Sequence, residues 1–555
     1  MIENLIGIFD NINIYNQNGG SDKISNNKNI KLTKTNLYIY DMIKNTKISK
    51  CKINTNLEYN SSTIQSESTS EVDSEVVSEV DSEVDSEVDS ELNLDLDLDL
   101  DLDLNLNFII SDTIKSNQIE LDSDDKIMKT LLIPLLNSNT VTVGIFIKAG
   151  SRQETEAFGI AHFLEHMTFK GTLKRSSTQL MIDLDSIGAI YNAMTGHEFT
   201  LYYISGDPRD ILLLLDIIID LYLNPTYPES DIEKEKNVVL EELRMDEDNN
   251  HRQLSSNLYK HIYDNIDQTL ARPIIGFKDT ISLLNKQNIL NYRKQYYKGS
   301  NCLLAVSGNF DSEVVIKFIE KQFNANLICK KSDQHLFYSN IIKNPNINNL
   351  LTLNPTITKH LHVDKSINQT IINFVFGSYD TYNQNNNALD IFCNILSNGF
   401  SSRLFDLLRN KMGVSYYNNS FYRDYNDTGQ FIISIGVDHV SVIKTITGVL
   451  DELKNIIING ITINELAKAQ KQNETNLLFQ FKDPYEYLMY YGMNLLMEKP
   501  LYSLNDMLTN IDNVKMNDIH TVITNIINAK NIIIGTIGKV SESDSKKIIE
   551  LINNF

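Results

Sequence analysis

Residues 158–171 read FGIAHFLEHMTFKG and are the most informative stretch of the sequence. Their apolar spacing predicts a helix over about residues 157–171, which places His162 and His166 four residues apart on one helix face. Two neutral imidazoles one helical turn apart can bind one zinc ion. Glu165 then lies beside the ion, where its carboxylate can accept a proton from water. The motif is a candidate metal centre; the competing interpretation is a surface helix with two incidental histidines.

A catalytic zinc ion needs a third protein ligand, and an acidic stretch further along the chain offers several. Residues 233–249, EKEKNVVLEELRMDEDN, have the apolar spacing of a helix. Spacing alone leaves Glu235, Glu241 and Glu242 open as the ligand. A charge run on a helix is usually a solvated face, so this stretch points to a metal only together with the two histidines.

Around these motifs the predicted elements form two similar series. Residues 129–150 suggest two strands around Asn137, Ser138 and Asn139, which is a hairpin signal. Further predicted elements are strands at 201–205 and 302–308 and helices at 211–223 and 231–248, then a strand at 370–378, a helix at 388–396 and strands at 430–437 and 531–539. The late NIIIGTIGK parallels the earlier NCLLAVSGN, because each closes its series. We therefore expect two homologous α/β halves.

Composition divides the chain into four parts. We expect an acidic, low-complexity extension at 1–126, a first half at 127–335, a linker at 336–360 and a second half at 361–555. Sixteen acidic residues and no Lys or Arg lie between residues 67 and 103, in Ser-Glu-Val-Asp and Leu-Asp repeats, so this tract carries most of the net charge of −22. Such a tract is predicted to be disordered, as a tolerated repeat expansion or, alternatively, an acidic interaction tail.

Charge and composition exclude several classes of protein. The chain is net negative even without the acidic tract, which argues against a general nucleic-acid binder, since such a protein needs a basic face. Its four cysteines are far apart, which excludes a disulfide scaffold and a cysteine zinc ribbon. The most apolar run, 211–223, contains Asp216 and Asp220, so no membrane-spanning helix is expected. The first residues lack a basic region followed by an apolar core, which favours a soluble, intracellular protein, cytoplasmic rather than mitochondrial.

Three segments together resemble the pitrilysin/insulinase family of zinc peptidases, whose motif is inverted to HxxEH. They are HFLEHMTFKGT at 162–172, YNAMTGHEFTLYYIS at 191–205 and EKEKNVVLEELRMDED at 233–248. Within the family, the chain is similar to the bacterial processing-type peptidases and to the beta subunit of the mitochondrial processing peptidase. The resemblance covers about 127–555. It implies an α+β fold of two homologous halves, each an antiparallel sheet with helices, that enclose a chamber.

The resemblance also assigns roles by position. His162, His166 and Glu242 match the ligands of one zinc ion per chain, and Glu165 matches the general base. Glu235 matches an acidic residue that supports a ligand from behind.

Four further residues match positions that contact substrate. Asn192 matches the edge strand that binds the substrate backbone, although it also suits a turn before a strand. Phe169 matches the pocket that follows the scissile bond, although it also suits the core. In SSRLFDLLRNKMGVSYYNNSF, at 401–421, Arg409 and Tyr416 match the pair that reaches the substrate carbonyl, where an oxyanion needs a donor.

The resemblance thus implies a zinc-dependent metalloendopeptidase that cleaves peptides or unfolded N-terminal extensions. By the same resemblance it works as a homodimer, or as a heterodimer with a related subunit. The alternative is a catalytically silent structural or regulatory subunit of the same fold. Such subunits typically have a broken metal motif, whereas every matched metal position is intact here.

Overall fold

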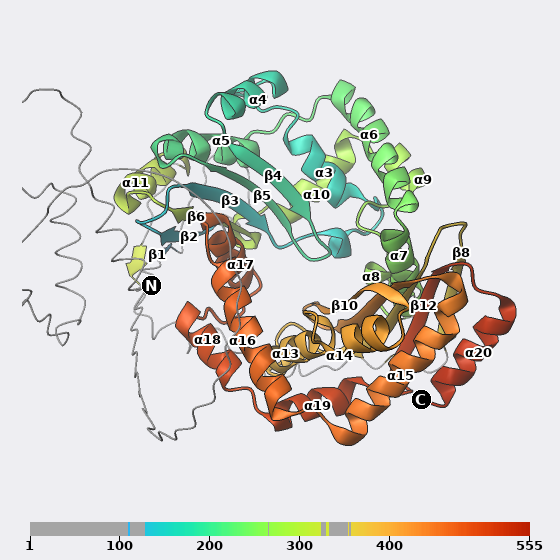
Figure 1. Ribbon diagram of the computed structural model, residues 1–555. Coiled ribbons are helices and arrows are strands. Elements are labelled where there is room, and N and C mark those ends of the chain that lie inside the picture. Colours follow the sequence, from blue (N-terminus) through green and yellow to red (C-terminus); the bar gives the residue numbers. More distant parts are fainter. Residues whose placement is uncertain (1–108, 112–127, 265, 324–328, 332–352, 354–356) are drawn as a thin grey trace, which may run out of the picture. The chain divides into compact units, whose positions relative to one another are not determined.

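The described part of the protein, in a computed structural model, contains two β-sheets with helices on their faces (Figure 1). It comprises residues 109–111, 128–264, 266–323, 329–331, 353 and 357–555, without the side chains of residues 109–111 and 329–331 and of Tyr416. The acidic tract lies outside the described residues. We call residues 128–331 the N-terminal half and residues 357–555 the C-terminal half.

The N-terminal sheet has seven strands in the order β4-β5-β3-β6-β2-β1-β7. Its strands are β1 (Ile109–Ser111), β2 (Lys129–Pro134), β3 (Val141–Ile147), β4 (Ile190–Thr195), β5 (Thr200–Gly206), β6 (Cys302–Gly308) and β7 (Cys329–Lys331). The C-terminal sheet has five strands in the order β10-β11-β9-β12-β8. They are β8 (His360–Asp364), β9 (Thr370–Ser378), β10 (Ser415–Asp424), β11 (Gly429–Val437) and β12 (Ile532–Gly538).

The two sheets share one topology. Without β1 and β7, the strands β4-β5-β3-β6-β2 correspond in order to β10-β11-β9-β12-β8. The directions agree as well, because β2 is parallel to β6 and β8 is parallel to β12, while the other corresponding pairs are antiparallel. The predicted repeat of two α/β halves is confirmed.

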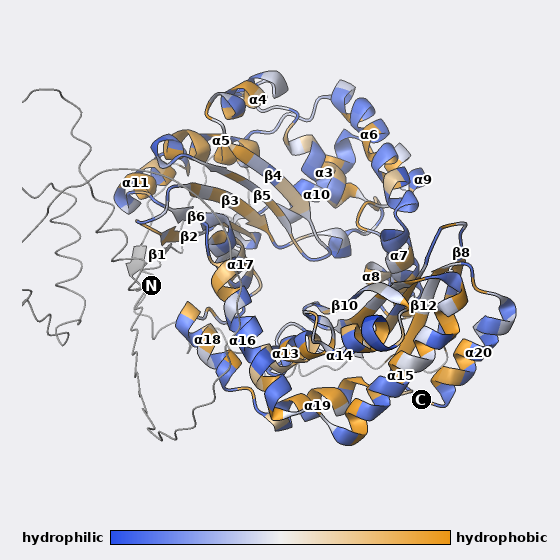
Figure 2. Ribbon diagram, viewed as in Figure 1, coloured by the Kyte–Doolittle hydropathy of each residue, from blue (hydrophilic) through white to orange (hydrophobic). Residues whose placement is uncertain are grey.

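The helices follow the same repeat. Those of the N-terminal half are α3 (Ile160–Thr168), α4 (Ser177–Ser186), α5 (Ile211–Leu223), α6 (Glu229–Asp248), α7 (Asn250–Tyr263), α8 (Gln268–Ala271), α9 (Lys278–Leu283), α10 (Lys286–Tyr296) and α11 (Ser312–Phe323). Those of the C-terminal half are α13 (Asn386–Ser397), α14 (Arg403–Phe405), α15 (Val442–Asn459), α16 (Ile463–Gln480), α17 (Pro484–Leu496), α18 (Leu504–Asp512), α19 (Met516–Ile526) and α20 (Glu542–Asn553). Apolar residues predominate along α5, whereas α6 is largely hydrophilic (Figure 2).

The predicted hairpin around Asn137, Ser138 and Asn139 is wrong. β2 and β3 do not pair with each other, because β6 lies between them and pairs with both. Both strands are buried on their two faces, and such strands lie in the middle of a sheet rather than in an isolated hairpin. The turn signal was local, and the long-range pairing with β6 outweighed it.

Each half covers one face of the other half's sheet. Leu488 and Tyr491 of α17 pack on the N-terminal sheet in one apolar cluster with Leu131 and Phe146. Reciprocally, helix α7 packs on the C-terminal sheet in an apolar cluster that includes Ile533. Both sheets are thus buried on two faces by helices from both halves, which explains the nearly continuous apolar runs of their central strands.

The predicted domain limits stay predictions. Two short strands extend the first sheet: β1 lies before residue 127, and β7 pairs with β1. No helix in the described part of the chain is long and apolar enough to cross a membrane.

Candidate metal centre

Helix α3 presents the three motif side chains on the face that is not buried. Phe163, Leu164 and Met167 are fully buried in the core of the N-terminal half. The helix starts at Gly159, whose φ of 91° is a conformation that glycine adopts without strain. Just before it, the buried carboxylate of Glu154 accepts hydrogen bonds from the backbone N–H groups of Gly159 and Ala161, each at 2.9 Å. These bonds satisfy free amides of the first helical turn and fix where the motif begins.

The structure brings His162, His166 and Glu242 together. One ligand atom from each residue lies within 4.8 Å of the others, although Glu242 comes from helix α6. The Oε2 atom of Glu242 lies 3.7 Å from Nε2 of His162 and 3.5 Å from Nε2 of His166. Of the three glutamates that spacing left open, Glu242 is the one in this group; Glu241 is exposed and pairs with Arg244.

Glu235 lies behind His166 rather than in the group. Its Oε1 lies 2.9 Å from Nδ1 of His166, and its Oε2 lies 2.6 Å from Nζ of Lys170. Burial lowers the pKa of His166, but the carboxylates of Glu235 and Glu242 outweigh this effect and raise the pKa to about 9. A metal ligand whose second nitrogen is held by a carboxylate has a fixed ring orientation and greater basicity.

The donor set fits a zinc ion. Burial lowers the pKa of His162 to about 4, so its imidazole is neutral, which is the form that binds metals. Two imidazole nitrogens and one carboxylate oxygen are three protein ligands of the kind found in catalytic zinc sites. The positive charge of an ion would also replace the proton that the carboxylates hold on His166.

Glu165 lies next to this group but outside it. Its Oε2 atom accepts a short hydrogen bond from Oγ1 of Thr195 on strand β4. Burial raises the pKa of Glu165 above its usual value, while the bond from Thr195 opposes the rise. A partly buried carboxylate with a raised pKa beside a metal group is suited to proton transfer.

The other predicted site residues lie around this centre. Asn192 is exposed on β4, the edge strand of the N-terminal sheet, and pairs there with Tyr203. Phe169 is half-buried, with its ring centre 6.3 Å from that of Tyr191 and 6.0 Å from that of Tyr202. Its surroundings are core aromatics, and its proposed role in a substrate pocket stays a prediction.

Arg409 and Tyr416 lie on irregular backbone. Arg409 belongs to a π-helical turn, Asp406–Lys411, and its guanidinium lies 5.9 Å from the ring centre of Phe405. Tyr416 is the additional residue of a β-bulge in β10, between Ser415, which pairs with Val437, and Tyr417, which pairs with Gly436. The side chain of Tyr416 lies outside the described residues.

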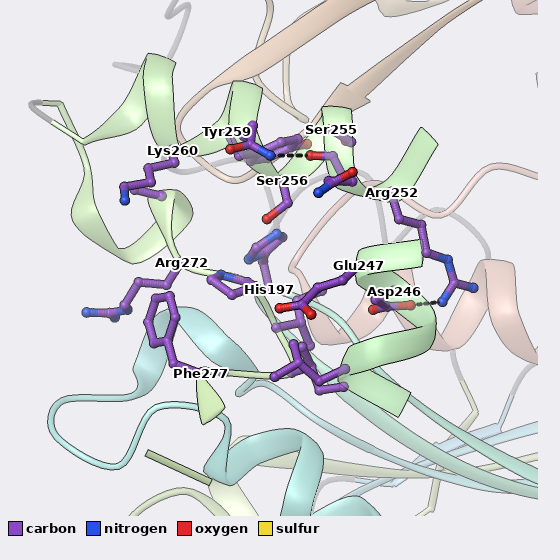
Figure 3. Close-up of a pocket in the computed structure, with 18 of the residues that line it drawn as sticks. His197, Asp246, Glu247, Arg252, Ser255, Ser256, Tyr259, Lys260, Arg272 and Phe277 are labelled. Atoms are coloured by element: carbon purple, nitrogen blue, oxygen red, sulfur yellow. Dashed lines mark hydrogen bonds and ion pairs between the residues drawn. The ribbon is translucent and has the colours of Figure 1, made fainter. Parts of the chain in front are cut away.

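A cavity of about 600 Å³ adjoins the centre and was not indicated by the sequence. Leu243 and Asp246 of α6 line it, together with residues of α7, of the segment 271–278 and of β10 (Figure 3). The His197 ring lies nearly parallel to that of Tyr259, with the ring centres 5.8 Å apart. The residues that line this cavity include none of the three metal ligands.

Three contributors to the site escaped the sequence analysis. Glu154 anchors the motif helix, Lys170 pairs with Glu235, and Thr195 donates to Glu165. Lys170 and Thr195 both lie inside the segments that carry the family resemblance, which was the only available signal. Nothing in the spacing of Glu154 distinguished it from a surface glutamate.

Comparison with known proteins agrees with this site. Residues 130–276 match the family model described as Insulinase (Peptidase family M16), and residues 284–473 match the Peptidase M16 inactive domain. An uncharacterized zinc protease of Rickettsia bellii (strain RML369-C) is 31% identical over 344 residues, which cover 61% of this chain and 78% of that protein. The beta subunit of the mitochondrial-processing peptidase of Mus musculus is 27% identical over 415 residues, covering 72% and 81%.

Solved structures show the same fold. The crystal structure of a protease from Helicobacter pylori superimposes with a TM-score of 0.64 at 21% identity and covers 78% of this chain and 100% of that chain. Together with the sequence relatives, these matches place the chain in a class of two-halved peptidases. The chain belongs to the insulinase family of peptidases, and the resemblance in its motifs is confirmed.

Proposed function

We propose that this chain is a zinc-dependent metalloendopeptidase that cleaves peptides or unfolded N-terminal extensions of proteins. One observation carries the proposal: His162, His166 and Glu242 converge from two helices, with Glu165 beside them. The names of the relatives, zinc protease and mitochondrial-processing peptidase, support it.

The chemistry follows from these residues. A zinc ion held by His162, His166 and Glu242 would supply a Lewis acid that polarises a peptide carbonyl and acidifies water. Glu165 takes a proton from the attacking water and returns it to the nitrogen of the leaving amine. Glu235 keeps the ring of His166 in its binding orientation throughout.

Strand β4 is the proposed docking edge for the substrate. It is the last strand of its sheet, so an extended peptide can add to it as a further strand. The N–H of Ala193 on this strand donates to Oδ1 of Asn192 at 2.9 Å, and the peptide would replace this contact. Asn192 lies exposed on this strand and would hold the substrate backbone.

Arg409 and Tyr416 are the proposed donors to the oxyanion on its other side. Support comes from their backbone, because π-helical turns and β-bulges recur at functional sites, where they redirect a side chain. The C-terminal half, by this proposal, supplies substrate contacts rather than metal ligands.

A catalytically silent subunit is the competing proposal, and the description "inactive domain" of the matching family model bears on it. That match covers residues 284–473, which contain none of His162, His166 and Glu242. A heterodimer with a related subunit is proposed by likeness to the mitochondrial-processing peptidase, whose matching chain is named a beta subunit, and a homodimer is the alternative.

The test is cleavage of a basic, presequence-like peptide by the purified full chain, with and without a zinc chelator. We expect cleavage that the chelator abolishes and zinc restores, and we expect E165Q to bind zinc stoichiometrically while losing activity about 100- to 10,000-fold. E241Q, on the exposed side of α6, is the matched control and should cleave normally. Absence of zinc in the purified chain would support the silent subunit instead.

A further inference from the structure

The hydroxyl of Thr195 makes the one hydrogen bond that is found for the Glu165 carboxylate among the described residues. Thr195 Oγ1 donates to Oε2, and the other oxygen, Oε1, has no partner in that part of the chain. A hydroxyl has a single proton to donate, so this donor is committed to Glu165. One carboxylate oxygen is therefore held in place while the other is left to accept a proton.

The pleat of strand β4 aims Thr195 at helix α3. Tyr191 and Ala193 pack against the core cluster that contains α3, whereas Met194 packs against the cluster on the opposite face. Because side chains alternate along a strand, Thr195 lies on the same face as Tyr191 and Ala193. Asn192, which we propose to hold substrate, lies on the same strand three residues earlier.

The end of β4 that carries Thr195 is fixed on several sides. Gly196 closes a tight turn by donating its N–H to the carbonyl oxygen of Phe199 at 2.8 Å. The N–H of Ser151, in the segment before α3, donates to the carbonyl oxygen of Gly196 at 3.2 Å. Gly150 is so close that a Cβ atom there would lie 2.2 Å from the same oxygen. Hydrogen bonds and close packing thus hold the chain leading to α3 against the end of β4.

We propose that Thr195 is a positioning residue that fixes the general base Glu165 from the strand to which the substrate binds. A change in the position of β4 is transmitted to Glu165 through one hydrogen bond, so docking at this edge and placement of the base are linked. The inference rests on the proposed peptidase function and adds to it a residue that acts through Glu165 without touching the metal.

The test compares T195V, which keeps the shape but lacks the donor, with T195S, which keeps the donor. For T195V we expect kcat to fall about 10- to 100-fold, since loss of the base's placement acts on the chemical step. KM should stay within about twofold, because the strand backbone is unchanged. T195S should recover most of the activity, which a purely structural role of the threonine methyl group would not allow.

The matched control is T200V, on the neighbouring strand. Thr200 pairs with Thr195 across the sheet, and its hydroxyl donates to the carbonyl oxygen of Ala149 at 2.9 Å rather than to Glu165. T200V should change kcat much less than T195V does. Equal losses in T195V and T200V, or full activity of T195V, would overturn the inference.

A double-mutant cycle, read out as melting temperatures, distinguishes failure of this inference from failure of the proposed function. The full-length wild type, T195V, E165A and the double variant are compared in the presence of zinc; E165A is used because the amide oxygen of a glutamine would still accept the hydrogen bond from Thr195. If the hydrogen bond exists, the double variant should melt higher than the sum of the two single losses predicts. If the two substitutions are coupled in melting temperature but the wild type cleaves no peptide, the proposed function is refuted and the hydrogen bond between Thr195 and Glu165 is supported. Additive losses would refute the contact itself.

Discussion

The two halves use equivalent helix pairs for different purposes. In the N-terminal half, α3 follows strand β3 and packs against α6; in the C-terminal half, α13 follows the corresponding strand β9 and packs against α16. The α3 helix carries His162, Glu165 and His166, whereas α13 contains no His and no Glu. In the part of the chain that the structure describes, only the N-terminal pair assembles three metal-ligating side chains.

The contacts between the paired helices show how the metal-binding pair differs from its counterpart in the C-terminal half. His166 of α3 meets Glu235 of α6, while Asn394 of α13 donates a short hydrogen bond to Asn473 of α16. A neutral amide pair satisfies its polar groups without a metal. Around the two imidazoles of the N-terminal pair, the buried carboxylate of Glu235 and the partly exposed carboxylate of Glu242 supply negative charge that a cation can balance. The shared topology therefore positions an equivalent helix pair in each half, and a few charged side chains determine which half can bind metal.

The largest expected effect comes from removing a metal ligand in the N-terminal half. H166A and E242Q should each lose stoichiometric zinc and cleave below detection, because three protein ligands are needed to retain a catalytic zinc ion. N394A, in the equivalent helix of the C-terminal half, should keep its zinc. Metal analysis of the purified proteins is the measurement. Equal zinc contents in all three variants would show that the metal group lies elsewhere.

A smaller effect is expected from the residue behind the ligand. E235Q should weaken zinc affinity about 10- to 100-fold, because the charge that orients and polarises His166 is lost. Competition titration against a chelator of known affinity measures it. E233Q is the matched control on the same helix, since Glu233 is exposed and forms an ion pair with Lys236 rather than with a metal ligand. If E235Q binds zinc like wild type, the contact to His166 has no role in metal binding.

Much of the fold was predictable because its signals are local. The predicted strand at 302–308 and helix at 211–223 have the bounds that the structure gives them, since continuous apolar runs leave few alternatives. The order of strands was not predictable from the run of elements. β6 comes from about 155 residues later in the chain and separates β2 from β3, which no turn motif between those strands records.

The site, like the fold, has a part that local sequence predicts and a part that depends on long-range packing. His162 and His166 lie one turn apart, so their proximity follows from helix geometry alone. Glu242 reaches them from another helix, and spacing could not separate it from Glu235 and Glu241; the family resemblance supplied that choice. Contacts such as that of Thr195 with Glu165 depend on how a strand end lies against a helix, which no sequence period encodes.

The pH dependence of zinc binding tests the electrostatics of the metal-binding pair. In the metal-free protein the pKa of His166 is about 9, so at pH 7 its ring holds a proton that zinc must displace. Affinity should therefore rise with pH, about tenfold per pH unit up to pH 9, and then level off. In E235Q the zinc affinity should stop rising at a lower pH, because the charge of Glu235 no longer raises the pKa of His166. A wild-type affinity that is flat between pH 7 and pH 9 would contradict the charge arrangement.

The smallest expected effect concerns Lys170, which pairs with the carboxylate oxygen of Glu235 that does not contact His166. Its ammonium group lies 2.6 Å from Oε2 of Glu235, and its side chain is about one-third exposed. Partly exposed ion pairs contribute at most about 1 kcal/mol, which corresponds to about a fivefold change in an equilibrium constant.

Removing the charge of Lys170 has two opposed consequences: Glu235 becomes a stronger acceptor for His166, but its carboxylate is less firmly held. Because orientation governs ligand support, we expect K170M to weaken zinc binding about 3- to 5-fold and K170R to restore it. Tighter binding in K170M would show that the charge of Glu235, rather than its placement, limits the affinity of this half for metal.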